Sequence, residues 1–116
     1  MSNIEKGVEA MLDHMRNDYI GWSRSGGRDI SEQILSDSEK RYCDGLHYTV
    51  GKKYIKVING ENHGSVSGFI VNTEDDKKFR LGDILKPAGW RGPAKNFARG
   101  NILERNFSRL RWTGPL

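Results

Sequence analysis

The hydrophobic pattern of this chain changes period near Leu46, and that change limits the fold to one that combines helices with strands. From Ile4 to Trp22, apolar residues recur every three or four positions, as they do on one face of an α-helix. After Leu46, short segments rich in β-branched and aromatic residues alternate with turn residues. The pattern therefore predicts an α+β protein.

The first helix is predicted from about Asn3 to Trp22. Ser2 and Glu5 have the spacing of a capping box, which favours a helix start at this point. The apolar stripe that follows consists of Ile4, Val8, Met11, Leu12, Met15, Tyr19 and Trp22. The part of the stripe formed by Met11, Met15, Tyr19 and Trp22 is more than a small sheet covers, so the helix is also a candidate surface for a homodimer.

A second helix is predicted after a glycine- and serine-rich loop at residues 23–28. Asp29 is its expected N-cap, and Glu32 has the position from which a side chain reaches back to the cap. An irregular apolar stripe continues to Tyr42, and Gly45 ends the helix.

Strands account for most of the remaining chain. They are expected at residues 48–50, 54–58, 66–71, 79–85 and 109–112. Asn59 and Gly60 tolerate a positive φ, which favours an antiparallel hairpin between the second and third of these strands. One short helical turn is expected at residues 94–99, closed by Gly100. The predicted architecture is two N-terminal helices packed on a small antiparallel sheet, followed by a basic, loop-rich C-terminal segment.

The length of the chain and its single cysteine narrow the organisation further. A chain of 116 residues has the size of one compact domain, so we predict a single domain over residues 1–116. Cys43 is the only cysteine, which excludes an internal disulfide and a cysteine-rich zinc site.

No apolar run approaches the roughly 18 residues of a membrane span, and the N-terminus does not resemble a signal peptide. We expect a cytoplasmic protein that does not enter a membrane.

Positive charge is concentrated in residues 86–112. This segment holds seven lysines and arginines against one acid, Glu104, whereas residues 1–85 hold 12 bases and 14 acids. Arginine predominates, and its planar guanidinium suits bidentate contacts with phosphate as well as stacking. Aromatic residues lie between the bases, and aromatic rings stack on nucleic-acid bases. The segment is therefore a candidate binding site for a phosphate-bearing ligand.

The candidate ligand-binding residues fall into three groups. Positive side chains neutralise phosphate, aromatic rings stack on a base, and amides donate or accept hydrogen bonds. The set consists of Trp90, Arg91, Lys95, Asn96, Phe97, Arg99, Asn101 and Arg109. The alternative is that Trp90, Phe97 and Trp112 are core residues and that the arginines form a solvated rim paired with acids.

No set of residues for catalysis or metal binding can be assembled from the sequence. Cys43 and His47 are four residues apart, but Gly45 argues against the continuous helix that would bring them together. His14 and His63 lack partner ligands at metal spacing, and both are expected to be solvated. Glu74, Asp75 and Asp76 are typical of a solvated turn. We expect a protein that is not an enzyme and that carries no metal or cofactor.

One segment carries a resemblance to a known group of proteins. After the strand and hairpin segments 54–58 and 69–71, the run GDILKPAGWRGPAKNFARGNI at residues 82–102 resembles small uncharacterised proteins of tailed bacteriophages. These share a Lys-x-Ala-x-Trp-Lys/Arg-x-Pro-Ala-Lys segment followed by Arg-Gly-Asn or Arg-Gly-Ser. The resemblance implies a phage setting and gives no activity.

Together these features lead to two functional hypotheses. The first is a non-enzymatic phage accessory protein in the host cytoplasm that binds nucleic acid or a nucleotide signal, with a role in counter-defence. The second is a protein–protein inhibitor of a host or defence enzyme, docked through the first helix or the basic face. Salt dependence of binding distinguishes polynucleotide from nucleotide, and binding to neither favours the inhibitor.

Overall fold

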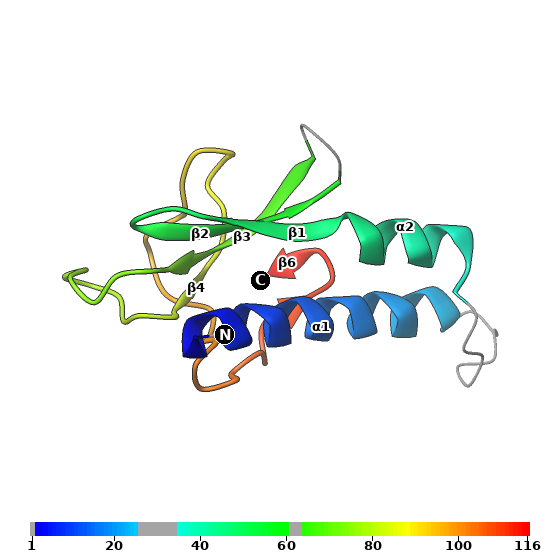
Figure 1. The fold of residues 1–116 in the computed structure, drawn as a ribbon, viewed down its shortest axis with the longest axis horizontal. Coiled ribbons are helices and arrows are strands. Elements are labelled where there is room, and N and C mark those ends of the chain that lie inside the picture. The colour runs from blue at the N-terminus through cyan, green and yellow to red at the C-terminus, as the bar shows by residue number, and fades with distance from the viewer. Residues whose placement is uncertain (1, 26–34, 61–63) are drawn as a thin grey trace.

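The computed structural model describes residues 2–25, 35–60 and 64–116, and these form an α+β fold (Figure 1). The helices are α1 (Asn3–Arg24) and α2 (Asp37–Gly45). A four-stranded antiparallel sheet has the order β1-β2-β3-β4, and β5 and β6 form a separate hairpin. The strands are β1 (Leu46–Val50), β2 (Tyr54–Asn59), β3 (Ser65–Val71), β4 (Ile84–Leu85), β5 (Leu110–Arg111) and β6 (Gly114–Pro115). The predicted α+β class is confirmed.

Helix α1 begins where the sequence predicts and extends two residues further. The Ser2 hydroxyl oxygen accepts a hydrogen bond from the backbone N–H of Glu5 and thereby satisfies one free donor of the first turn. The predicted apolar stripe faces the sheet, since Val8, Met11, Leu12 and Met15 are buried. Trp22, at the end of the stripe, is exposed.

Helix α2 begins later than predicted. Ser36 is its N-cap, and a complete capping box joins Ser36 to Glu39. Leu35 lies before this cap and outside the helix, so the prediction of one continuous helix up to Gly45 was wrong at this point. The expected cap Asp29 and its partner Glu32 lie outside the described residues.

The sheet separates two groups of buried side chains. On one face, α1 and the C-terminal hairpin cover a core that includes Ile55, Val57, Ile70 and Leu110. On the other face lies a smaller cluster of Phe69, Val71, Phe79 and Leu85. Figure 1 shows α1 on one side of the sheet and the loop of residues 86–98, in yellow, on the opposite side. The two faces of the sheet are therefore covered by different parts of the chain.

Residues 86–94 fold back on themselves beside the smaller cluster. The N–H of Ala94 donates to the carbonyl of Lys86, and the N–H of Ala88 donates to that of Gly92. Ala98 then packs on the smaller cluster. This part of the chain is a loop closed by its own backbone hydrogen bonds.

Two C-terminal predictions need correction, and a third is confirmed with shorter bounds. Residues 94–99 form no helical turn, because the Arg99 N–H donates to the carbonyl of Ile84 and draws this stretch alongside β4. The strand predicted at residues 79–85 is reduced to Ile84–Leu85, since Gly82 has a φ of +88° and interrupts the extended backbone. The strand at 109–112 is present as β5, and β6 is its unpredicted partner.

Candidate functional site

Arg99 was a predicted phosphate ligand, and the structure places its guanidinium inside the protein. The side chain is 7% exposed. Its Nε donates to the backbone oxygen of Leu116 at 3.1 Å, and Nη1 donates to Asn96 Oδ1 at 2.8 Å and to the Phe97 carbonyl at 3.0 Å. Arg99 thus fixes the end of the loop to the C-terminal hairpin.

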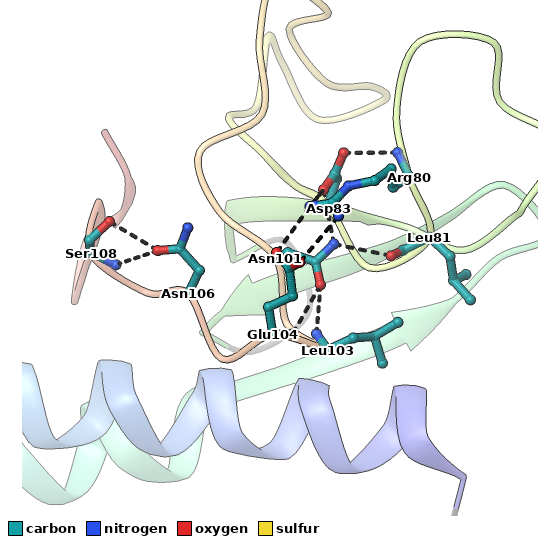
Figure 2. A network of polar contacts seen from close by, with 8 residues as sticks. All are labelled: Arg80, Leu81, Asp83, Asn101, Leu103, Glu104, Asn106 and Ser108. Carbon is teal, nitrogen blue, oxygen red and sulfur yellow. Dashed lines mark hydrogen bonds and ion pairs between the residues drawn. The ribbon is translucent and has the colours of Figure 1, made fainter.

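Asn101 is also bonded within the protein, as Figure 2 shows. Its amide nitrogen donates to the Leu81 carbonyl at 3.1 Å and to Asp83 Oδ1 at 2.9 Å. Its oxygen accepts the N–H groups of Leu103 at 2.8 Å and Glu104 at 3.2 Å. Because these bonds occupy both donors and both lone pairs of the amide, Asn101 organises the loop around it.

The other predicted site residues are exposed on or beside the loop. They are Trp90, Arg91, Lys95, Asn96, Phe97 and Arg109. The Trp90 ring is 44% exposed, and Lys56 Nζ lies 4.3 Å from its centroid. The Phe97 ring is 46% exposed and lies 3.9 Å from the guanidinium carbon of Arg99 and 5.3 Å from that of Arg109.

The alternative, that these aromatic residues belong to the core, therefore applies to only one of the three. Trp112 is half-buried and packs against Tyr42 and Tyr19, at ring-centroid distances of 5.9 and 5.0 Å. Trp90 and Phe97 keep nearly half of their surface in solvent. Both rings combine an exposed surface with a neighbouring positive charge.

Lys95 also lines an open cavity of about 540 Å³ that the sequence did not predict. Five lysines surround it: Lys52, Lys53, Lys77, Lys78 and Lys95. Thr73, Asp75, Asp76 and Phe79 complete the lining. Lys78 Nζ donates to the Lys95 carbonyl at 2.6 Å, which joins the turn after β3 to the C-terminal loop. The cavity is lined by five positive and two negative side chains.

Asp76 shapes this cavity through the backbone. Its Oδ1 accepts the N–H groups of Phe79 at 2.9 Å and Lys78 at 2.8 Å, and these bonds, that of Phe79 first, lower the pKa of the carboxyl group. The carboxylate therefore holds the turn that presents Lys77 and Lys78. The expectation that residues 74–76 form a solvated turn is correct for Glu74 and Asp75, whereas Asp76 is partly buried.

The register of the sheet explains why distant lysines meet. Tyr54, at the start of β2, pairs with Val71, at the end of β3. The turn that carries Lys52 and Lys53 is thus adjacent to the turn that follows β3, and the Asn72 N–H donates to the Lys53 carbonyl at 2.9 Å. The sequence did contain a signal for this cavity. Lys52-Lys53 precedes the first strand of the predicted hairpin and Lys77-Lys78 follows the second, so antiparallel pairing brings the two pairs to the same end.

The histidines and the cysteine form no reactive group within the described residues. Burial raises the pKa of the Cys43 thiol, and His47 Nδ1 lies 2.8 Å from the Gly45 carbonyl. His14 is half-buried rather than solvated as expected, with Nε2 3.2 Å from the Leu110 carbonyl. His63 lies outside the described residues. Across residues 2–25, 35–60 and 64–116 no cluster of three potential metal ligands occurs, and neither helix is long and apolar enough to cross a membrane.

Comparison with known proteins gives a family assignment. A family of unknown function, DUF7717, matches residues 1–115. Because the match covers nearly the whole chain, this protein belongs to that family. No curated protein and no solved structure matches the chain.

Proposed function

We propose that this protein is a non-enzymatic nucleic-acid-binding protein that holds a polynucleotide on the lysine-lined cavity and the adjoining loop. The observation that carries the proposal is the convergence of five lysines, from three separate segments, on one open cavity. Clustered positive charge of this kind neutralises phosphates and releases the counterions bound to them.

The distribution of these groups favours a polynucleotide over a small nucleotide. Lysine ammonium groups act as point charges without a fixed bonding plane, which suits a flexible chain of phosphates. A closed nucleotide pocket needs convergent polar groups that are free to bond the ligand. Arg99 and Asn101, the predicted residues best suited to that role, form their hydrogen bonds within the protein.

Trp90 and Phe97 supply the second element of the proposed interface. Exposed aromatic rings stack on successive bases of a single strand, with roughly 1–3 kcal/mol per stacked base. Lys95 lies at the cavity and Phe97 only two residues further along the loop. A single strand that crosses the cavity therefore meets phosphate-neutralising groups first and a stacking surface next.

Binding of a labelled single-stranded oligonucleotide, measured by fluorescence anisotropy over a salt series, tests this proposal. We expect affinity to fall steeply with salt, with a log–log slope of about −0.7 per neutralised phosphate. Lys77→Gln and Lys95→Gln should each make the slope shallower by about 0.7. Lys6→Gln is the matched control, because Lys6 is exposed on α1, the helix that packs on the opposite face of the sheet.

Two results would overturn the proposal. One is binding whose salt slope the Lys77 and Lys95 variants leave unchanged. The other is an absence of binding to any polynucleotide at low salt. In the second case, salt-insensitive binding of a mono-, di- or cyclic nucleotide would favour a nucleotide signal, and binding of neither would favour the protein-inhibitor hypothesis.

The proposed biological setting is the infected bacterial cell. It depends on the resemblance of residues 82–102 to small phage proteins. A nucleic-acid-binding accessory protein in the host cytoplasm, acting in counter-defence, is the role that we propose in that setting.

A further inference from the structure

Strand β1 forms one edge of the four-stranded sheet, and its outer side is open. At the opposite edge, β4 is covered by the C-terminal loop, because the Ile84 N–H donates to the Gly100 carbonyl and the Ile84 carbonyl accepts the Arg99 N–H. Among the described residues, no strand pairs with the outer side of β1. An edge of this kind is a template for another strand.

The hydrogen bonds at the two ends of β1 show which of its groups point outward. The Gly60 N–H donates to the Gly45 carbonyl, and the Gly51 N–H donates to the Tyr54 carbonyl. Since bonding residues alternate along an antiparallel strand, His47 and Thr49 also face β2. The N–H and C=O groups of Leu46, Tyr48 and Val50 therefore point to the open edge.

Leu46 already has partners for its backbone groups. Its N–H donates to the Tyr42 carbonyl, and its carbonyl accepts a bond from Arg16 Nη2 at 3.2 Å. The N–H and C=O groups of Tyr48 and Val50 have no partner within the described part of the chain. The open edge thus offers two donors and two acceptors in an alternating row.

We propose that β1 pairs with β1 of a second copy of this chain, antiparallel, about a two-fold axis at Thr49. In this register Tyr48 of each copy lies opposite Val50 of the other. Each such pair exchanges two N–H···O=C bonds, so that all the open groups of Tyr48 and Val50 gain a partner. The two sheets then become one continuous sheet.

The charges that flank β1 favour this antiparallel arrangement. Asp44 precedes the strand, Lys52 and Lys53 follow it, and all three side chains are exposed. Antiparallel pairing places the acidic end of one strand beside the basic end of the other, whereas parallel pairing would bring like charges together. Two arginines lie near this end as well: Arg16, whose charge is paired with Asp13 at 3.0 Å, and the exposed Arg41, which borders the same cavity as Asp44. Parallel pairing would still bring Lys52 and Lys53 of both copies together.

Strand β1 also lacks the features that keep edge strands apart. Residues Leu46–Val50 have the sequence LHYTV, with no lysine, proline or acid. Val50 is 64% exposed, which leaves an apolar side chain at the proposed contact. A second copy of the chain provides hydrogen-bond partners for the open backbone groups and opposite charges for the flanking residues. For this reason we infer that the partner of β1 is a second copy.

Sedimentation analysis at high micromolar concentration tests the proposal first, and we expect a dimer. Val50→Pro removes an outward N–H without removing a bond to β2, so the variant should be a folded monomer by sedimentation and circular dichroism. Asp44→Lys and Lys52→Asp should each weaken the dimer by about tenfold or more, because each replaces two symmetric attractions by repulsions.

A mixture of the two charge variants gives the most specific readout. An Asp44→Lys copy paired with a Lys52→Asp copy has opposite charges at both ends, so native mass spectrometry of the mixture should show predominantly the heterodimer. Within one chain, residues 44 and 52 are separated by the length of β1, about 20 Å or more at 3.3 Å per residue. Formation of the heterodimer on mixing therefore reports a contact between two copies and not a contact within one chain.

A wild-type monomer at high micromolar concentration would overturn the proposal. The open edge of β1 would then be a candidate binding site for a strand of another protein. A dimer that tolerates Val50→Pro, or a mixture without preference for the heterodimer, would place the contact elsewhere, for example on α1. None of these measurements contains nucleic acid, so their outcome is independent of the proposed function.

Discussion

Glu39 is a buried carboxylate that joins the end of α1 to the start of α2. Its Oε2 accepts a hydrogen bond from Arg24 Nε at 3.0 Å, and its Oε1 accepts one from the Ser36 N–H at 2.8 Å. The Arg24 side chain, followed by the Ser36 N–H, lowers the pKa of Glu39 from 4.5 to about 2. The ionised form is therefore the one that fits the folded protein.

This pKa shift predicts a specific pH dependence of stability. Because the folded-state pKa is lowered, Glu39 stabilises the fold above its unfolded-state value of 4.5, and this contribution is lost as the pH falls toward about 2. Glu39→Gln should lower the thermal unfolding midpoint at neutral pH, since the ion pair between Glu39 and Arg24 is then lost. We expect the difference in midpoint between wild type and variant, followed by circular dichroism, to narrow between these two pH values. A constant difference would contradict the prediction.

At the scale of elements, the loop from Ile84 to Ile102 depends on one tight backbone approach. Gly100 has a φ of +152°, and a Cβ at this position would lie 2.2 Å from the Asn106 carbonyl oxygen. That oxygen also accepts the Asn101 N–H, so it has little freedom to move. Both the φ value and the contact exclude any larger residue.

Gly100→Ala should consequently destabilise the protein by about 2–4 kcal/mol, from backbone strain together with the steric clash. Gly89→Ala is the matched control in the same loop, because a Cβ added to Gly89 would meet no atom within 4 Å. Urea unfolding of both variants measures the difference. Equal midpoints for the two variants would show that the loop adjusts without cost and would contradict this account.

The elements that the sequence predicted well are those defined by local signals. The Ser2–Glu5 spacing located the start of α1, and Asn59–Gly60 indicated the hairpin of β2 and β3. The break before α2 was missed because Asp29–Glu32 has the same spacing as Ser36–Glu39, the pair that forms the capping box of α2. The helical turn predicted at residues 94–99 was wrong because the contacts of this stretch with β4 are not local.

The candidate site shows the same limit. The sequence pointed to Trp90 and Phe97, and both rings are exposed. It could not show that Arg99 is buried and forms its hydrogen bonds within the protein. The lysine-lined cavity was missed because its members come from segments far apart in the sequence. Only the pairing of β2 with β3 brings these segments together. Charge in a sequence window therefore singles out residues 86–112 as a candidate, whereas strand register is needed to find the cavity.

For the whole molecule, the two proposed surfaces meet at the turn between β1 and β2. Lys52 and Lys53 line the cavity and also directly follow the open edge strand. In the proposed dimer the two copies of this turn lie at opposite ends of the paired strands. One dimer therefore presents two cavities, and each retains Lys77, Lys78 and Lys95 away from the edge.

This arrangement, which depends on both proposals, predicts that affinity rises with the length of the nucleic acid. A strand long enough to reach both cavities binds the second one within the same complex, and the gain in affinity comes from effective concentration without any new contact. Val50→Pro should therefore weaken binding of a long single strand by more than about tenfold and leave binding of a short oligonucleotide unchanged. Anisotropy titrations with both lengths measure this. Equal weakening at both lengths would indicate damage to the cavity itself, and no weakening at either would mean that a single copy binds alone.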